Sequence, residues 1–306
     1  MRVVVARAGR AWSETRGGTY SCEMGAQNPP VQSDTHGQLL VCATPIGNLE
    51  DVTLRVLDAL KRADVVACED TRHTQILLDR HGIAATRLVS LHEHNELARA
   101  PALTARVRAG ETVALVSDAG TPLISDPGFA LVRACLGEGL PVEVLPGPSA
   151  AVAALVASGL PVARWRFVGF LPRKRSELEG LLARAQETTI AFESPRRLAA
   201  TLKLIAEADS GRAVAVCREL TKLHEEVRRS SAVELAEHYA NDPPRGEVVL
   251  AIGAAEPGAR QRDEALDALR ELVEAGAKPR LGASVVAKLT GVGANELYRE
   301  LMRGEQ

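Results

Sequence analysis

The chain has 306 residues, of which 46% are hydrophobic and 25% charged, and its formal net charge is -2. This length and composition predict a globular protein of two domains with room for a small third. The near-neutral charge does not indicate a nucleic-acid-binding protein and does not exclude one, because local basic patches are what meet phosphates. Five scattered cysteines without a CxxC pair fit reduced thiols in the cytoplasm and argue against a thiolate zinc site.

Neither the beginning of the chain nor its most apolar stretch has the pattern of a targeting or membrane segment. Residues 1–36 contain arginines but no sustained apolar core, so we interpret them as a disordered, dispensable extension and not as a secretory signal. Residues 150–160 are too few and too rich in alanine to span a membrane. No membrane partner is therefore expected.

From residue 38 onward, strand-like and helix-like segments alternate. Apolar runs predict buried strands at 38–43, 64–70, 87–92, 112–118 and 142–147. Helical periodicity over 49–63 places one apolar face on Val52, Val56, Leu57, Leu60 and Ala63, and a second helix over 71–82 is stopped by Gly82. This pattern predicts a mostly parallel sheet with helices on both faces.

A corner of small residues at 146–150 precedes a second α/β set. Strands are expected at 166–171, 188–192, 212–220 and 247–252, with helices near 176–186, 196–207 and 232–240. A three-helix pattern follows at 263–275, 282–290 and 294–303, with Gly276 and Gly291 at its breaks. The expected organisation is an extension (1–36), an α/β domain (37–148), a second α/β domain (149–254) and a helical tail resembling a helix-turn-helix (255–306).

Polar loops rich in small residues follow successive strands of the first set. They lie at 43–48, 68–74, 117–128 and 146–150, and the carboxyl ends of parallel strands are where open α/β sheets bind ligands. Each loop alone is typical of an ordinary turn, but together they favour a ligand site. No GxGxxG follows the first strand and no P-loop occurs, so neither a dinucleotide fold nor a P-loop phosphotransferase is indicated. Glu69 and Asp70 end a strand where carboxylates can accept hydrogen bonds from ribose hydroxyls.

A series of motifs occurs in one order along the chain. It includes TPIGN (44–48), EDTRHT (69–74), HEHNE (92–96), SDAGTPLISDPG (117–128), LPGPSA (145–150), FVGFLPRK (167–174), FESPRRL (192–198) and RELTK (218–222). From about residue 37 to its end the chain resembles the ribosomal RNA small subunit methyltransferase I family, within the tetrapyrrole methylase superfamily. That family usually has Tyr-Glu-Ser-Pro-His-Arg at 192–197, so no role is carried over for the tyrosine hydroxyl or the histidine.

The resemblance implies two α/β domains with a cleft between them, binding S-adenosylmethionine as methyl donor. The implied reaction is 2′-O-methylation of a cytidine in the decoding region of 16S rRNA, on free RNA or the small ribosomal subunit, by a homodimer that needs no metal. Because methyl transfer depends on positioning, the small-residue loops are expected to hold the donor by main-chain groups. The donor residues are then Pro45, Asp118, Gly120, Thr121, Ser149 and Ala150, with Asp118 facing the ammonium or the sulfonium.

Several side chains are candidates for the general base that accepts the proton of the 2′-hydroxyl. The catalytic candidates are Glu69, Asp70, His92 and Glu93, with His94 and Glu96 nearby. If this segment is an extended strand, His92 and His94 lie on one face and suggest a metal-binding pair. The alternative interpretation of HEHNE is a helix start with Asn95 as N-cap. Arg72 and His73 either bind phosphate or pair with Glu69 and Asp70.

Three basic clusters in the second set predict an RNA-binding wall beside the cleft, with Trp165 stacking on a base. The residues assigned to RNA are Arg72, Trp165, Arg173, Lys174, Arg175, Arg196 and Arg197. Each cluster alone is typical of a solvated face. Two rival functions are a tetrapyrrole (precorrin-type) methyltransferase and a non-catalytic, ligand-sensing regulator that binds nucleic acid through the tail.

Overall fold

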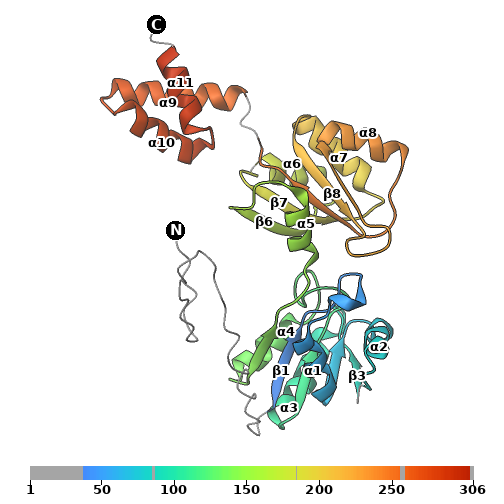
Figure 1. Cartoon of the computed structure of the whole chain (residues 1–306). Helices are drawn as coiled ribbons and strands as arrows, with labels where there is room; N and C mark the ends of the chain where they lie inside the picture. Colours follow the sequence, from blue (N-terminus) through green and yellow to red (C-terminus); the bar gives the residue numbers. More distant parts are fainter. Residues whose placement is uncertain (1–36, 85–86, 184, 256–258, 304–306) are drawn as a thin grey trace, which may run out of the picture. The chain divides into compact units, whose positions relative to one another are not determined.

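The computed structural model describes residues 37–84, 87–183, 185–255 and 259–303. The expected disordered extension at 1–36 lies outside these ranges. The first sheet holds β1 (Gln38–Cys42), β2 (Val65–Cys68), β3 (Leu88–Ser90), β4 (Thr112–Leu115) and β5 (Val142–Leu145). Its order is β3-β2-β4-β1-β5 and every pairing is parallel, which confirms the predicted parallel sheet (Figure 1).

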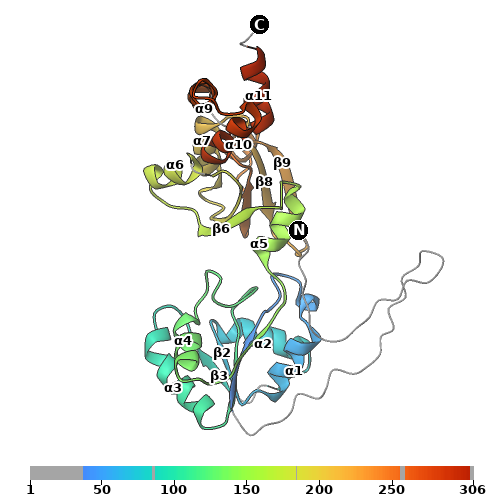
Figure 2. The same ribbon diagram turned by 90° about the vertical axis from the view of Figure 1, so that its left-hand side faces the viewer.

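Helices cover both faces of the first sheet, as predicted (Figure 2). One core packs α1 (Leu54–Arg62) and α2 (Thr71–Arg80) against alternate strand residues such as Leu40 and Val66. The opposite core packs α3 (Glu96–Arg108) and α4 (Phe129–Gly137) against the intervening residues, such as Leu39 and Val65. Alternation along each strand therefore divides the apolar side chains between two layers.

The helix expected over 49–63 is interrupted in the structure. A short 3₁₀ turn (Leu49–Asp51) precedes α1, and Thr53 caps α1 by accepting a hydrogen bond from the backbone N–H of Val56. The prediction that Val52 belongs to the helix is wrong, because that residue is the C-cap of the 3₁₀ turn and precedes α1, although it packs against the same core. Ala59 is buried in the helix instead.

The second sheet is mixed. It contains β6 (Trp165–Phe170), β7 (Thr188–Glu193), β8 (Ala213–Arg218), β9 (Glu226–Ser231) and β10 (Val248–Ile252), in the order β6-β7-β10-β8-β9. Only β6 and β7 pair in parallel. Helix α5 (Ala150–Ser158) packs on one face, and the core of the other face includes α6 (Arg175–Ala183), α7 (Leu198–Ala208) and α8 (Ala232–Asn241). Strand β9 was not predicted.

The tail forms the three expected helices, α9 (Ala259–Glu274), α10 (Pro279–Thr290) and α11 (Ala294–Arg303). Their apolar residues, among them Leu269, Val286 and Leu301, make a separate core. Gly276 (φ 94°) and Gly291 (φ 78°) end α9 and α10 in left-handed conformations, as predicted. No helix within the described ranges is both long and apolar enough to cross a membrane.

Candidate active site

The loops after β1 and β4 are joined to each other by backbone hydrogen bonds. The N–H of Thr44 donates to the carbonyl of Gly120 at 2.8 Å, and the N–H of Gly120 donates back at 3.1 Å. The Thr44 hydroxyl also donates to the carbonyl of Ser117 at 3.0 Å. These bonds hold the start of the loop 117–128 against the TPIGN motif.

The loop 117–128 is strained along its length. Two residues that are not glycine, Leu123 (φ 74°) and Ser125 (φ 68°), have left-handed backbones, as do Gly120 (φ 83°) and Gly128 (φ 125°). A Cβ at Gly128 would lie 2.7 Å from a Leu115 methyl, so a side chain there would displace Leu115 as well as strain the backbone. Left-handed residues other than glycine cost about 1–3 kcal/mol each and cluster at functional sites.

A cavity of about 390 Å³, which we call the main cavity, opens beside this loop. A volume of that size suits a small-molecule ligand. Four of the six expected donor residues line it: Gly120, Thr121, Ser149 and Ala150. The second sheet and its loops contribute further lining residues, including Phe170, Phe192, Glu193 and Glu219.

The other two expected donor residues, Pro45 and Asp118, line a neighbouring cavity of about 370 Å³. Both cavities include Ile46, Ala119 and Glu247 in their walls. The loops of the two sheets also contact each other here, since the N–H of Asn48 donates to the Thr221 hydroxyl at 3.0 Å. The structure thus brings all six residues to two adjoining cavities.

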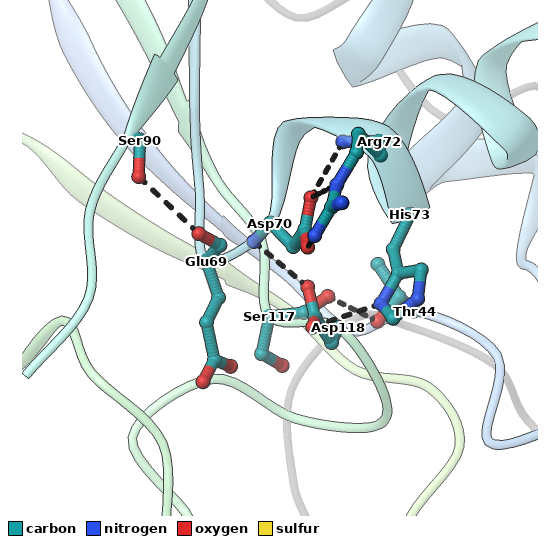
Figure 3. Close-up of polar contacts among 8 residues, drawn as sticks. All are labelled: Thr44, Glu69, Asp70, Arg72, His73, Ser90, Ser117 and Asp118. Carbon is teal, nitrogen blue, oxygen red and sulfur yellow. Dashed lines mark hydrogen bonds and ion pairs between the residues drawn. The ribbon is translucent and has the colours of Figure 1, made fainter.

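Asp118 lies at the centre of a polar network (Figure 3). Its carboxylate accepts the backbone N–H of Asp70 at 2.9 Å and contacts His73 Nδ1 at 2.9 Å. Asp70 caps α2 and binds the Arg72 guanidinium, with a shortest N–O distance of 2.6 Å. Hydrogen bonds from the Arg72 side chain and backbone hold the pKa of the Asp70 carboxyl far below its usual range. Arg72 therefore pairs with Asp70 and His73 with Asp118.

Glu69 differs from Asp70 in its surroundings. Burial raises the pKa of its carboxyl, and the nearby Asp118 charge adds to the effect. The Ser90 hydroxyl donates to the Glu69 carbonyl at 3.3 Å (Figure 3). Glu69 nevertheless lines neither cavity.

The HEHNE segment forms a turn that leads into α3. Asn95 occupies the N-cap position, but its side chain makes no cap bond and instead accepts the N–H of His92 at 2.9 Å. The helix start with Asn95 as N-cap is therefore confirmed, although the side chain makes no capping hydrogen bond. The His92 and His94 rings meet edge to face at 5.9 Å, and neither His92 nor Glu93 lines either of these two cavities. Among the described residues, no group of three possible ligands is placed to hold a metal ion.

Three carboxylates of the second domain border the main cavity, although no sequence argument assigned them to a site: Glu193, Glu219 and Glu247. Glu193 is fully buried, accepting the Thr201 hydroxyl at 2.6 Å and the Ser194 N–H at 2.7 Å. Glu219 accepts the Glu247 N–H at 2.9 Å and pairs with Lys222 at 3.0 Å. The only signal of Glu193 and Glu219 in the sequence was membership of the FESPRRL and RELTK motifs.

The basic residues expected to meet RNA have unequal surroundings. Arg175 pairs with Glu179 and Glu207, and Lys174 pairs with Glu177. Arg197 donates to the carbonyls of Leu171 and Pro172, whereas Arg173 and Arg196 are exposed.

Two aromatic side chains of β6 differ in their relation to the cavities. Trp165 is 37% exposed and lines neither. Phe170 is 62% exposed, lines the main cavity and lies 5.5 Å from the Phe192 ring. Phe170 is therefore the aromatic ring at the mouth of the site.

A parallel sheet followed by a mixed sheet, with small-residue loops around a cavity, defines a tetrapyrrole methylase fold. The family model of the Tetrapyrrole (Corrin/Porphyrin) Methylases matches residues 38–236. Among solved structures, uroporphyrin-III-C-methyltransferase from Thermus thermophilus superimposes with a TM-score of 0.53 at 23% identity, covering 71% of this chain and 94% of that one. The same enzyme has been solved complexed with S-adenyl homocysteine.

Curated relatives give a finer assignment. Ribosomal RNA small subunit methyltransferase I of Mesorhizobium japonicum is 48% identical over 86% of this chain and 91% of its own length. The protein of that name from Thermotoga maritima is 41% identical over 72% of this chain and 100% of its own length. This chain therefore belongs to the tetrapyrrole methylases and, among them, to the ribosomal RNA small subunit methyltransferase I family. The resemblance inferred from the motifs is confirmed.

Proposed function

We propose that this protein transfers a methyl group from S-adenosylmethionine to the 2′-oxygen of a cytidine ribose in the decoding region of 16S rRNA. Family membership at 48% identity carries the assignment to a methyltransferase acting on small-subunit ribosomal RNA. The finer target, a cytidine 2′-oxygen, follows from the family resemblance of the motifs. The main cavity supplies a space of suitable size beside strained, small-residue loops.

The main cavity fits the donor chemically. Ser149 and Ala150 begin α5, and the Ser149 side chain does not cap that helix, so its first backbone N–H groups favour a carboxylate such as the amino-acid tail of the donor. Asp118 borders the adjoining cavity and supplies negative charge for the ammonium or the sulfonium. The donor supplies a methyl group on a positively charged sulfur, and the loops hold that methyl in line with the acceptor.

The acceptor nucleotide would be bound by the second domain. Arg173 and Arg196 are the exposed cations we assign to phosphates, and Phe170 is better placed than Trp165 to stack on a base near the reacting ribose. Lys174, Arg175 and Arg197 contribute less free charge because they already bind carboxylates or carbonyls. The proposal also includes a homodimer and a cytoplasmic location, and no membrane partner.

The test is methylation by the purified protein with radiolabelled S-adenosylmethionine. We expect label in 16S rRNA or small subunits isolated from cells that lack the modification, and in a decoding-region RNA, mapped to one cytidine. The matched control is the same RNA with 2′-deoxycytidine at that position, which should accept no label. Label that persists on the deoxy substrate would place the methyl on a base, and label on a precorrin but not on RNA would favour the tetrapyrrole alternative.

A further inference from the structure

The main cavity contains few groups that can accept a proton. Among the described residues that line it are four carboxylates and one thiol, and no histidine, lysine, arginine or tyrosine: Asp126, Glu193, Glu219, Glu247 and Cys217. Burial raises the pKa of the Cys217 thiol to about 11, so it stays protonated at neutral pH. A base in this cavity must therefore be one of the carboxylates.

Three of the four carboxylates already accept hydrogen bonds from, or form ion pairs with, other residues of the protein. Glu193 accepts hydrogen bonds from Thr201 and the Ser194 N–H and lies 3.4 Å from the Arg197 guanidinium. Glu219 and Glu247 share the ammonium of Lys222, at 3.0 and 2.9 Å. A carboxylate bound to a cation is a weak base, because the pairing favours its ionised form.

Asp126 is placed differently. Within the part of the chain that the structure describes, no cation lies within ion-pair distance of it. It follows Ser125, which has a left-handed backbone (φ 68°) and lies beside β6, since a Cβ at Gly169 would be 3.5 Å from the Ser125 hydroxyl. This brings the half-buried Asp126 carboxylate to the cavity wall that also includes Phe170 and Thr121. The loop thus presents to the cavity a carboxylate that has no cationic partner among the described residues.

Burial raises the pKa of the Asp126 carboxyl to about 6, a hydrogen bond from Ser117 opposes the shift, and the charges of Glu69 and Asp118 add to it. A base with a pKa near the working pH combines ionisation with affinity for the proton. Asp118, by contrast, is held by the Asp70 N–H and by His73. Neighbouring carboxylates in unlike surroundings are typical of a division of roles.

We propose that Asp126 is the catalytic base that accepts the proton of the ribose 2′-hydroxyl, an inference that rests on the proposed function. As the 2′-oxygen forms its bond to the methyl carbon, the bond from that carbon to sulfur breaks and its electron pair stays on sulfur. The hydroxyl proton moves to an Asp126 carboxylate oxygen and then to solvent. The products are the 2′-O-methyl ribose, S-adenosylhomocysteine and a proton.

The charges of Glu69, after β2, and Asp118, after β4, act on the Asp126 carboxyl. The other charged or titratable residues in the walls of the two cavities are His73 on α2 and, from the second domain, Glu193, Glu219, Glu247, Lys222 and Cys217. Because the base must be ionised to accept a proton, the single-turnover rate should rise with pH through about 6 and then level off.

The experiment compares Asp126→Asn with wild type in single-turnover methylation at saturating donor and RNA, between pH 5 and 9. Asparagine keeps the size of the side chain but cannot take the proton. We expect a rate loss of about 100- to 10,000-fold, loss of the acidic limb of the pH profile, and dissociation constants for donor and RNA within twofold of wild type. Asp126→Glu should recover at least tenfold of the lost rate.

The control variant is Asp58→Asn, on an exposed aspartate of α1, which should react at the wild-type rate. If Asp126→Asn keeps its rate within threefold, or loses it only in step with donor affinity, the inference is overturned. Should Asp126→Asn fail to fold, Asp126→Ser serves in its place, and an acidic limb at wild-type pH in that variant, which has no carboxylate at this position, would overturn the inference equally. Failure of the proposed function is recognised separately, because wild type would then methylate no ribosomal RNA.

Discussion

The Asp126 carboxyl should reduce the stability of the protein at neutral pH. Its pKa is raised to about 6 in the folded state, from about 4 for an ordinary aspartate. Between these values the folded state binds more protons than the unfolded state, so this contribution to stability is complete below pH 4 and is lost as the pH rises through 6. The side chain keeps partial contact with solvent, so the effect is discounted to on the order of 1 kcal/mol.

We therefore expect Asp126→Asn to unfold at a temperature about 2 °C higher than wild type at pH 8, with the difference vanishing below pH 4. Thermal unfolding followed by circular dichroism at pH 4, 6 and 8 measures it. A difference that stays constant over this range would show that the Asp126 carboxyl titrates normally. A variant that is more stable but methylates much more slowly than wild type is typical of a functional group whose burial destabilises the protein.

Sequence reasoning predicted part of the lining of the main cavity for an identifiable reason. Gly120, Thr121, Ser149 and Ala150 belong to small-residue loops at strand ends, and such loops can be recognised without coordinates. Asp126 lies in a motif that was singled out, yet nothing in a linear sequence shows which aspartate of SDAGTPLISDPG is paired and which is not. That distinction depends on Asp70 and His73 reaching Asp118 from another loop.

At the scale of elements, the parallel sheet was predictable and the mixed sheet was only partly so. Its central strands β7, β8 and β10 are apolar runs, which the sequence reveals directly. Strand β9 (EVRRSS) pairs only with β8 and lies at the sheet edge, where charged residues are favoured. It therefore lacks the alternation by which strands are recognised, and strand direction is not encoded in hydrophobic periodicity at all.

The loops after β6 and β7 are joined through Arg197. Its guanidinium donates to the carbonyls of Leu171 and Pro172 and pairs with the buried Glu193. We expect Arg197→Ala to lower the free energy of unfolding by about 2–4 kcal/mol, because it leaves Glu193 buried with less compensation. Urea denaturation measures the loss.

The matched variant Arg196→Ala removes the neighbouring, exposed cation, and it should change stability by less than about 0.5 kcal/mol. If Arg196 meets a phosphate, this variant should flatten the salt dependence of RNA binding by roughly 0.7 to 0.9 of a unit in slope. Equal stability losses in both variants would contradict the division between a structural and an RNA-binding arginine, and an unchanged slope would remove Arg196 from the RNA surface.

At the scale of the whole molecule, the tail stands apart from the catalytic machinery. Its three helices have their own apolar core, and neither cavity beside the loop 117–128 includes a tail residue. The Thermotoga maritima relative matches 72% of this chain with 100% of its own length, so a similarly named protein lacks a counterpart for about a quarter of the chain. Residues 257–306 carry eight basic and eight acidic side chains, which gives the tail no net charge.

Removing residues 257–306 should therefore leave the methyl-transfer rate at saturating substrate and the donor affinity within twofold of the full chain. The truncated protein keeps Ala255, whose N–H donates to the Ala185 carbonyl, so this backbone hydrogen bond within the second domain is retained. If the tail helps to dock the ribosomal substrate, KM for small subunits should rise about fivefold, which corresponds to roughly 1 kcal/mol. Because the lost segment is neutral, the salt dependence of binding should not change. Steady-state kinetics with both proteins at several salt concentrations measure all three quantities. An unchanged KM would show that the tail does not dock the substrate, and a collapse of the rate or of donor affinity would place the tail in the active site after all.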